Sequence, residues 1–199
     1  MKRLLAGLLV LVFSSGIAFS QQTPRQVIEE TANAILTALD GRHEELRGDR
    51  EALYDLVDDI MLPRFDLQFA GAYVLGKYRR QATPEQKKRF VTAFYRSLVQ
   101  RYADGLLEYR QDSVEFLPFK PSTKPTRATV RTVVTLADGT KTPVDYGLRE
   151  TKQGWKVYDV TIEGISYLQN NRKIVTSEIG KSGLDNLIER LEAGSVKLD

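Results

Sequence analysis

The sequence contains no cysteine and only one histidine, His43, and these two scarcities exclude several kinds of chemistry. Without cysteine the chain has no disulfide, no thiol nucleophile and no thiolate ligand for a metal ion. The single histidine lies beside Glu44 and Glu45, a setting typical of a solvated surface rather than of a histidine cluster or a serine–histidine–aspartate triad. We therefore expect no metal ion, no resident cofactor and no catalytic set of these kinds.

Neither sign of charge is in clear excess. The chain has 29 Lys and Arg against 26 Asp and Glu, and removing Lys2 and Arg3 of the N-terminal segment leaves 27 basic side chains against those 26. Nucleic-acid-binding domains normally show a clear basic excess on one face. We therefore do not expect a nucleic acid partner.

Long apolar runs are absent except at the N-terminus, where residues 1–20 are predicted to form a secretory signal peptide. Basic residues precede the apolar stretch Leu4–Phe13, and Ala18 and Ser20 supply small side chains at the −3 and −1 positions of the cleavage site. Removing 20 of the 199 residues leaves 179, enough for the single domain that we expect over residues 21–199.

The absence of cysteine also bears on where such an exported chain works. No cysteine follows the cleavage site, so a lipid-anchored form is excluded, and no later segment has the length of a transmembrane span. An exported domain without disulfides is held together by packing, which suits the bacterial periplasm better than a small extracellular module. We therefore expect a periplasmic protein.

The first half of the mature chain has the apolar spacing of helices. The predicted helices cover residues 24–39, about 49–61 and 84 to about 109, with a charged linker to about residue 47 after the first. Pro24 and Pro84 each follow a threonine, which is typical of an N-cap and the first helical residue. Between the last two helices, Phe65–Leu75 is apolar on nearly all sides, which predicts a helix that is buried or borders a cavity.

The second half changes to the period of strands. Four strands are predicted at Ser113–Phe119, Arg127–Leu136, Thr142–Arg149 and Trp155–Ile162. Their short, turn-like connections force antiparallel neighbours. After Gly164 the chain returns to helix, and a last amphipathic helix contains Leu184 to Leu191. The predicted fold class is therefore α+β, with helices wrapped around a four-stranded antiparallel twisted sheet.

The last predicted strand carries apolar side chains on both of its faces, so we expect both faces to be covered. Asp159 lies inside this strand, where an unpaired carboxylate is costly. A structural hydrogen bond or ion pair is one role for it. The alternative is acid–base catalysis by Asp159 or Asp145 together with a tyrosine.

Several segments resemble the MlaC family of periplasmic phospholipid-binding, or toluene-tolerance, proteins. They follow one another in the family's order over essentially the whole mature chain, and they are Met61–Pro63, Phe69–Tyr78, Ala82–Gln86, Val157–Tyr167 and Gly183–Ile188. The segment VYDVTIEGISY, from Val157, is similar to the most characteristic part of that family.

The resemblance implies a cone of helices around a twisted sheet, related to the NTF2-like fold, with a deep apolar pocket for phospholipid acyl chains. It implies a carrier rather than an enzyme, with phospholipid as cargo. Its implied partners are an outer-membrane lipoprotein–porin complex and an inner-membrane ABC transporter with a lipid-binding ring. The implied role is to maintain outer-membrane lipid asymmetry.

The family pocket is lined by many apolar groups, so the resemblance indicates regions rather than a fixed set of residues. Our candidate lining residues lie in the buried segment, on the stripe of the longest helix and on the last two strands. They are Tyr73, Val74, Leu75, Phe94, Leu98, Tyr102, Leu106, Val144, Tyr146, Val157, Val160, Ile162 and Ile165. Two other functions stay open from the sequence: an NTF2-like enzyme acting on a small apolar substrate, and an interaction module without a ligand.

Overall fold

The computed structural model describes residues 22–108, 114–119, 123–136, 138–196 and 198. The helices are α1 (Pro24–Leu39), α2 (His43–Gly48), α3 (Arg50–Met61), α4 (Leu67–Leu75), α5 (Pro84–Leu106), α6 (Tyr167–Ser182) and α7 (Leu184–Glu192), with a 3₁₀ helix η1 (Gly76–Arg80) after α4. The strands are β1 (Val114–Phe116), β2 (Arg127–Thr135), β3 (Lys141–Thr151), β4 (Gly154–Ile162) and β5 (Ile165–Ser166). The predicted signal peptide lies outside the described residues.

Local sequence signals set the starts of the two best-defined helices. Thr23 and Thr83 are the N-caps of α1 and α5, and in each the threonine side chain accepts a hydrogen bond from the glutamine amide three residues on. The side-chain oxygens of the same glutamines, Gln26 and Gln86, accept a hydrogen bond from the N-cap amide, so both helices begin with a complete capping box. Each helix therefore begins where the sequence predicts.

The five strands form one sheet in the order β1-β2-β3-β4-β5, with every neighbouring pair antiparallel. The short links between β2, β3 and β4 impose this meander. A register shift between Gly147 and Leu148 interrupts the pairing of β3 with β4. The α+β class is confirmed, and the prediction of four strands is corrected to five.

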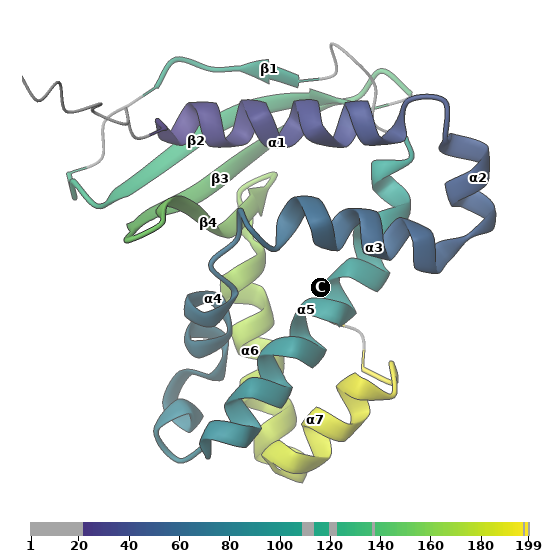
Figure 1. Ribbon diagram of the computed structural model, residues 1–199. Coiled ribbons are helices and arrows are strands. Elements are labelled where there is room, and N and C mark those ends of the chain that lie inside the picture. The colour runs from purple at the N-terminus through teal and green to yellow at the C-terminus, as the bar shows by residue number, and fades with distance from the viewer. Residues whose placement is uncertain (1–21, 109–113, 120–122, 137, 197, 199) are drawn as a thin grey trace, which may run out of the picture.

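Helices cover both faces of the sheet. Val27 and Ile28 of α1 pack on Ala128, Leu148 and Val157 on one face, and Figure 1 shows α1 lying lengthwise along the strands. On the other face α4 and α6 contact β4. In Figure 1 the helices α4 to α7 form a separate layer that extends away from the sheet. Every residue of β4 is at least half-buried, in agreement with the cover predicted on both of its faces.

The buried apolar residues form three clusters. The helical cluster joins α4, α5, α6 and α7, the α3–α5 cluster joins α1, α2, α3 and α5, and the sheet cluster joins α1 to β2, β3 and β4. The core is thus divided into three clusters, so we expect a functional site in the region between them.

Two predicted boundaries are wrong. The charged segment after α1 is the helix α2, because the buried Leu46 attaches it to the α3–α5 cluster while its charged residues face solvent. After Gly164 the chain does not enter a helix directly: Ile165 and Ser166 pair back on β4 as β5, and α6 begins at Tyr167. Tertiary contacts override the local pattern in both places.

None of the helices in the described part of the chain combines the length and the apolar character needed to cross a membrane.

Candidate functional site

The candidate lining residues occupy all three clusters. Tyr73, Val74, Leu75, Phe94 and Leu98 belong to or pack on the helical cluster, Leu106 packs on the α3–α5 cluster, and Tyr146, Val157 and Val160 belong to or pack on the sheet cluster. They are therefore spread around the molecule's interior rather than gathered at one spot.

Five of these candidates are fully packed. Val74, Leu75, Phe94, Val144 and Val157 are all buried, and the first two and the last retain at most 1% of their surface. A side chain on the wall of a cavity that admits a lipid tail keeps accessible surface in the ligand-free chain. These five residues therefore belong to the ordinary packed core, and they lie behind the residues that would contact a ligand.

Six candidates are only partly buried. They are Tyr73, Leu98, Leu106, Tyr146, Val160 and Ile162. They keep accessible apolar surface beside the packed clusters, and a ligand could cover that surface. Burying that area against a guest would be favourable by roughly 25 cal/mol per Å².

Strand register brings four candidates onto one face of the sheet. Val144 lies opposite Ile162, and Tyr146 lies opposite Val160, so β3 and β4 present a continuous apolar area there. Two further candidates are more exposed than the rest: Tyr102 on α5 and Ile165 on β5, which is 60% exposed.

Tyr102 connects the long helix to the start of α6. Its ring lies 5.3 Å from that of Tyr167 in an edge-to-face arrangement. Two turns earlier on the same helix Tyr95 donates a hydrogen bond of 2.7 Å to Asp58 of α3. Burial, and then this bond, raise the pKa of Tyr95, so its hydroxyl stays a neutral donor that ties α3 to α5.

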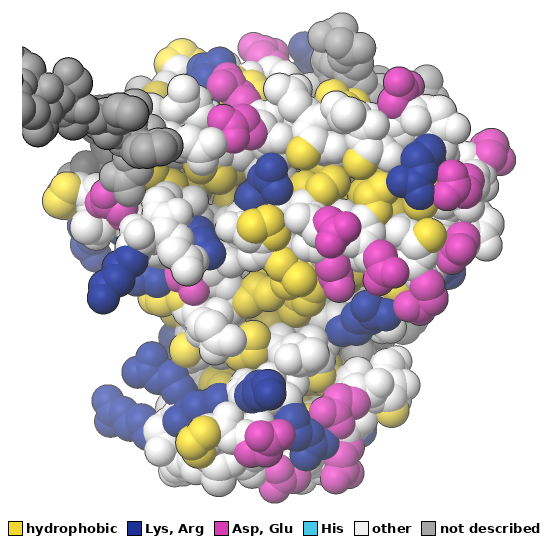
Figure 2. Space-filling view, in the orientation of Figure 1, with side chains coloured by type: hydrophobic (Ala, Val, Ile, Leu, Met, Phe, Trp, Pro, Cys, Tyr) yellow, Lys and Arg dark blue, Asp and Glu magenta, His cyan; other side chains and the backbone are white. Residues whose placement is uncertain are grey.

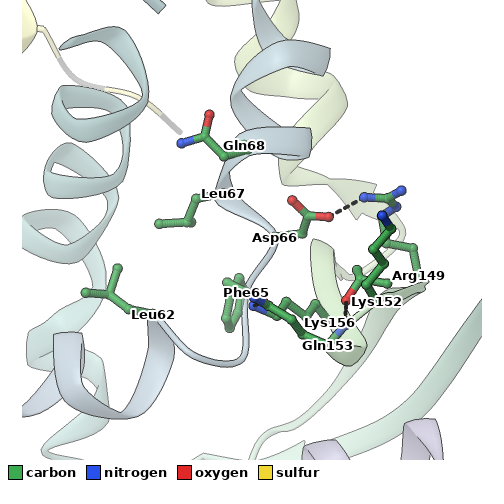
Figure 3. Close-up of a pocket in the computed structure, with 10 residues that line it drawn as sticks. Leu62, Phe65, Asp66, Leu67, Gln68, Arg149, Lys152, Gln153 and Lys156 are labelled. Atoms are coloured by element: carbon green, nitrogen blue, oxygen red, sulfur yellow. Dashed lines mark hydrogen bonds and ion pairs between the residues drawn. The ribbon is translucent and has the colours of Figure 1, made fainter. Parts of the chain in front are cut away.

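A hollow opens between α3, α4 and α5 (Figure 2). Figure 2 shows hydrophobic side chains inside it, below α3 and between α4 and α5 as placed in Figure 1. Leu62, which follows α3, is 44% exposed. In Figure 3 Leu62 and Leu67 both lie on the side of the α3–α4 connection that faces α5.

A groove of about 410 Å³ lies along this connection. Its lining combines apolar, acidic and basic side chains: Leu62, Phe65, Asp66, Leu67, Gln68, Arg149, Thr151, Lys152, Gln153 and Lys156. Figure 3 shows Arg149, Lys152, Gln153 and Lys156 on the side away from Leu67, where the turn between β3 and β4 projects toward the connection. One wall of the groove is thus apolar and the other is basic.

Backbone pairing with β4 positions the connection. The amide of Asp66 donates to the carbonyl of Val157 at 2.7 Å, and the amide of Val157 donates to the carbonyl of Arg64 at 2.9 Å. The Asp66 carboxylate then caps α4 by accepting a hydrogen bond of 3.0 Å from the amide of Phe69, and it pairs with Arg149. A single residue therefore fixes the groove, the helix start and the nearest strand.

The face of the sheet that α4 contacts carries a row of cations at this point. Arg127, Arg149 and Lys156 lie directly opposite one another on β2, β3 and β4. Like charges in this register repel. The guanidinium groups of Arg127 and Arg149 lie 4.7 and 4.8 Å from the centre of the Phe69 ring, and Asp66 supplies one compensating charge.

Arg127 is only partly compensated. Its guanidinium also lies 4.6 Å from the Tyr158 ring, yet its Nη1 is buried and has no hydrogen-bond partner. The three-cation row is therefore balanced by one carboxylate and two aromatic rings, which leaves this side of the groove positive.

The geometry of Asp159 supports the structural role. Its Oδ2 accepts a hydrogen bond of 2.7 Å from Ser166 Oγ, and its Oδ1 accepts one of 3.0 Å from the amide of Leu168 in the first turn of α6. A carboxylate held in this way braces the helix start. Within the described residues no cluster of His, Asp and Glu is arranged to hold a metal ion.

The basic wall of the groove was missed by sequence reasoning. Arg149, Lys152 and Lys156 stand near one another only because β3 and β4 form a hairpin in a particular register. In the sequence they are ordinary charges in a polar turn. The one available signal was Lys156, a charge directly after the tryptophan of an otherwise apolar strand.

Comparison with protein-family models gives a match to the MlaC protein family over residues 29–193. The chain belongs to the MlaC family. The resemblance carried by the sequence motifs is thereby confirmed.

Curated MlaC-family relatives include the toluene tolerance protein ttg2D of Pseudomonas putida. It is 35% identical over 162 residues, which are 80% of this chain and 75% of the relative. The intermembrane phospholipid transport system binding protein MlaC of Haemophilus influenzae is 25% identical over 178 residues, which are 88% of this chain and 83% of that protein.

A solved structure with the same fold contains a ligand. It is the phospholipid-binding protein from Ralstonia solanacearum in complex with a phospholipid, with a TM-score of 0.78 and 26% sequence identity. The superposition covers 85% of this chain and 94% of that one. The two chains thus share their architecture over nearly their full lengths.

Proposed function

We propose that this protein is a carrier that encloses the acyl chains of a phospholipid. The observation that supports it most strongly is the Ralstonia solanacearum structure, which has this fold and was solved with a phospholipid bound. The name of the Haemophilus influenzae relative, a phospholipid transport system binding protein, points to the same class.

The energetics of lipid transfer explain why a dedicated carrier is needed. Roughly thirty methylenes at about 0.8 kcal/mol each make a free lipid monomer in water unfavourable by some 20 kcal/mol. Such a carrier needs apolar area and a closable mouth, and no directional chemistry. The partly buried apolar residues on α5, β3 and β4 fit the first requirement.

We assign the tails and the headgroup to different parts of the site. Leu98, Leu106, Tyr146, Val160 and Ile162 have accessible apolar surface, and we place the acyl chains against them. The fully packed candidates form the wall behind. The groove at the α3–α4 connection combines apolar groups with uncompensated cations, so it suits the phosphate end of an amphiphile.

In the cell we place this carrier in the periplasm, between an outer-membrane lipoprotein–porin complex and an inner-membrane ABC transporter with its lipid-binding ring. There it would move phospholipid between the two membranes and so maintain the lipid asymmetry of the outer membrane. The predicted signal peptide over residues 1–20 and the predicted lack of disulfides support this location.

The two other functions have less support. An NTF2-like enzyme using Asp159 would need a free carboxylate, whereas both oxygens of Asp159 are engaged at the start of α6. A ligand-free interaction module would not need apolar groups with unfilled contact area. We therefore propose that the protein is not an enzyme and that phospholipid is its cargo rather than a cofactor.

Lipid extraction tests the proposal. Protein purified gently from periplasm is extracted with organic solvent, and the extract is analysed by mass spectrometry. We expect phospholipid in stoichiometric amount. An extract without phospholipid from protein prepared in this way would contradict the carrier function.

Two variants test the assigned lining. Leu98→Glu and Val160→Glu place a carboxylate against the proposed acyl chains, so each should abolish phospholipid retention while the far-UV circular dichroism spectrum stays near that of the wild type. Leu136→Glu is the matched control, because Leu136 is 47% exposed at the end of β2 and should keep its lipid. If both lining variants unfold, these positions are core and the assignment is wrong.

A further inference from the structure

A second positive surface lies away from the groove, at the far end of α4. It consists of Lys77, Arg79 and Arg80 of η1 together with Arg172 of α6, and we call these four residues the basic patch. All four are exposed. Figure 2 shows Lys and Arg side chains gathered at the lower left, over the end of α4 and the turn that follows it in Figure 1.

Two acid-free segments of the chain come together at this surface. No Asp or Glu occurs from Leu67 to Pro84, or from Gly164 to Ser177. The fold packs α6 against both α4 and η1, so the two segments are neighbours in space. Their charges therefore add to one another without local compensation.

The basic patch differs from most other arginines of the described chain in its pairing. None of its four cations forms an ion pair with any residue that the structure describes. Elsewhere in the described chain eight arginines do so: Arg25, Arg42, Arg47, Arg50, Arg89, Arg96, Arg149 and Arg190. Most guanidinium groups of the described chain are thus ion-paired, whereas the four cations of the basic patch are not.

Two cations of the basic patch, Arg172 and Lys77, are nevertheless held in place. The Arg172 guanidinium lies 4.8 Å from the centre of the Tyr73 ring, and Lys77 Nζ lies 5.0 Å from that of Tyr78. A Cβ at Gly76 would lie 3.1 Å from Nε of Arg172, so the glycine provides the room that the guanidinium occupies. Gly76 also has φ of +54°, which favours glycine on its own account.

Held cations without intramolecular partners are suited to binding carboxylates. A guanidinium group that is already oriented loses little conformational freedom when it binds a carboxylate in bidentate fashion. The spread of four cations over two elements fits an extended acidic surface better than one small anion.

The chemistry favours a protein over a lipid surface as the partner. Stable binding to a bilayer generally needs an apolar group that inserts as well as basic residues. The large exposed hydrophobic residues of the described chain are Leu62, Tyr102, Phe119, Leu136 and Ile165, and none belongs to α4, η1 or the patch-bearing part of α6. The basic patch therefore has charge without an inserting group.

We propose that the basic patch is a docking surface for an acidic face of a membrane-anchored protein partner. The inference rests on the proposed function, since a carrier must meet the machinery that loads and unloads it. The inference identifies which surface makes the contact and that the contact is ionic. It also places docking at η1, apart from lipid binding at the hollow and the groove.

Cosedimentation tests the proposal with defined probes. Purified full-length mature protein is mixed with inner-membrane and outer-membrane vesicles from the cells that make it, with the same vesicles after protease treatment, and with liposomes of their extracted lipids. We expect binding to at least one type of intact vesicle, weaker binding at raised salt, and loss of binding after protease treatment. Equal binding to the protein-free liposomes would overturn the assignment to a protein partner.

A pair of charge-reversal variants locates the contact. Arg79→Glu/Arg80→Glu should weaken vesicle binding by about tenfold or more. Lys124→Glu/Lys141→Glu changes the net charge equally at two exposed lysines, one in the loop before β2 and one at the start of β3, and should bind as the wild type does. Equal loss in both variants would show a general charge effect and would overturn the docking surface.

Lipid extraction of the same samples separates this inference from the proposed function. We expect Arg79→Glu/Arg80→Glu to retain its phospholipid while losing vesicle binding. Wild-type protein that retains phospholipid, with unchanged vesicle binding in the variant, would refute the docking surface alone. Wild-type protein without phospholipid would refute the carrier function.

Discussion

Asp159 shows how a single carboxylate can be read in two ways until its partners are known. In the sequence it is an acid in an apolar strand, compatible with either a structural or a catalytic role. In the fold, Ser166 Oγ caps the amide of Gln169 at 3.1 Å while Asp159 accepts from the amide of Leu168. The two side chains together satisfy two amides that the first turn of α6 leaves without helical partners.

Replacing Asp159 tests that brace. Asp159→Ala removes the acceptor for Leu168 and should lower the free energy of unfolding by about 2 kcal/mol, because hydrogen bonds to charged groups contribute on that order. Asp159→Asn retains one oxygen acceptor and should lose less. Urea unfolding followed by circular dichroism measures both variants. If Asp159→Ala were as stable as the wild type, the brace would contribute nothing.

The helices α4 and α5 approach each other closely where they cross. A Cβ at Gly71 would lie 2.6 Å from Cγ2 of Val91, a buried and β-branched side chain with little freedom to move. Glycine at this position costs α4 some helix propensity, about 1 kcal/mol relative to alanine. The close approach of the two helices explains why the chain accepts that cost.

A double-mutant cycle tests this contact. Gly71→Ala should destabilise the protein by about 1–2 kcal/mol, because overpacking outweighs the gain in helix propensity. In a Val91→Ala background the clash is gone, so the same substitution should be neutral or stabilising. Thermal and urea unfolding of the four proteins give the coupling energy. A coupling of zero would mean that α4 and α5 adjust freely at this crossing.

Element boundaries were predictable where the signal was local. The capping boxes at Thr23 and Thr83 place the starts of α1 and α5, and apolar spacing gives their buried faces. The short helix α2 and the two-residue strand β5 were not predictable, because neither has a strong local signal. They form because Leu46 is buried in the α3–α5 cluster and because Ile165 pairs with Ile162.

At the scale of the whole molecule, the proposed guest should be part of the folding energy. A ligand that binds only the native state stabilises it by about 2.7 kcal/mol when its concentration is a hundred times its Kd. Removing the lipid under native conditions should therefore lower Tm by about 5–10 °C for a chain of this size. Differential scanning calorimetry before and after extraction measures the change.

Adding phospholipid back provides the control for this experiment. The wild type should regain its original Tm, whereas Val160→Glu should show neither the loss nor the recovery. A wild-type Tm that is the same with and without lipid would contradict the idea that the interior is completed by a guest.

The candidate site was predictable as a set of regions but not as a set of contacts. Helical and strand spacing identified Tyr73–Leu75, the stripe on α5 and the last two strands as apolar. Spacing alone could not separate Val157, which is fully packed, from Val160, which keeps accessible surface. That difference depends on the neighbours in the fold, because Val157 is part of the sheet cluster whereas Val160 only packs against that cluster.

The sequence by itself determined the starts of α1 and α5, the antiparallel meander and the family, because capping residues, short turns and ordered motifs act over a few neighbouring positions. Only the tertiary structure decided which apolar residues are solid core, and how the cations group. Arg149 joins Arg127 and Lys156 through strand register, and Arg172 joins η1 through helix packing. Burial and charge are properties of neighbours in space, and those neighbours are far apart along the chain.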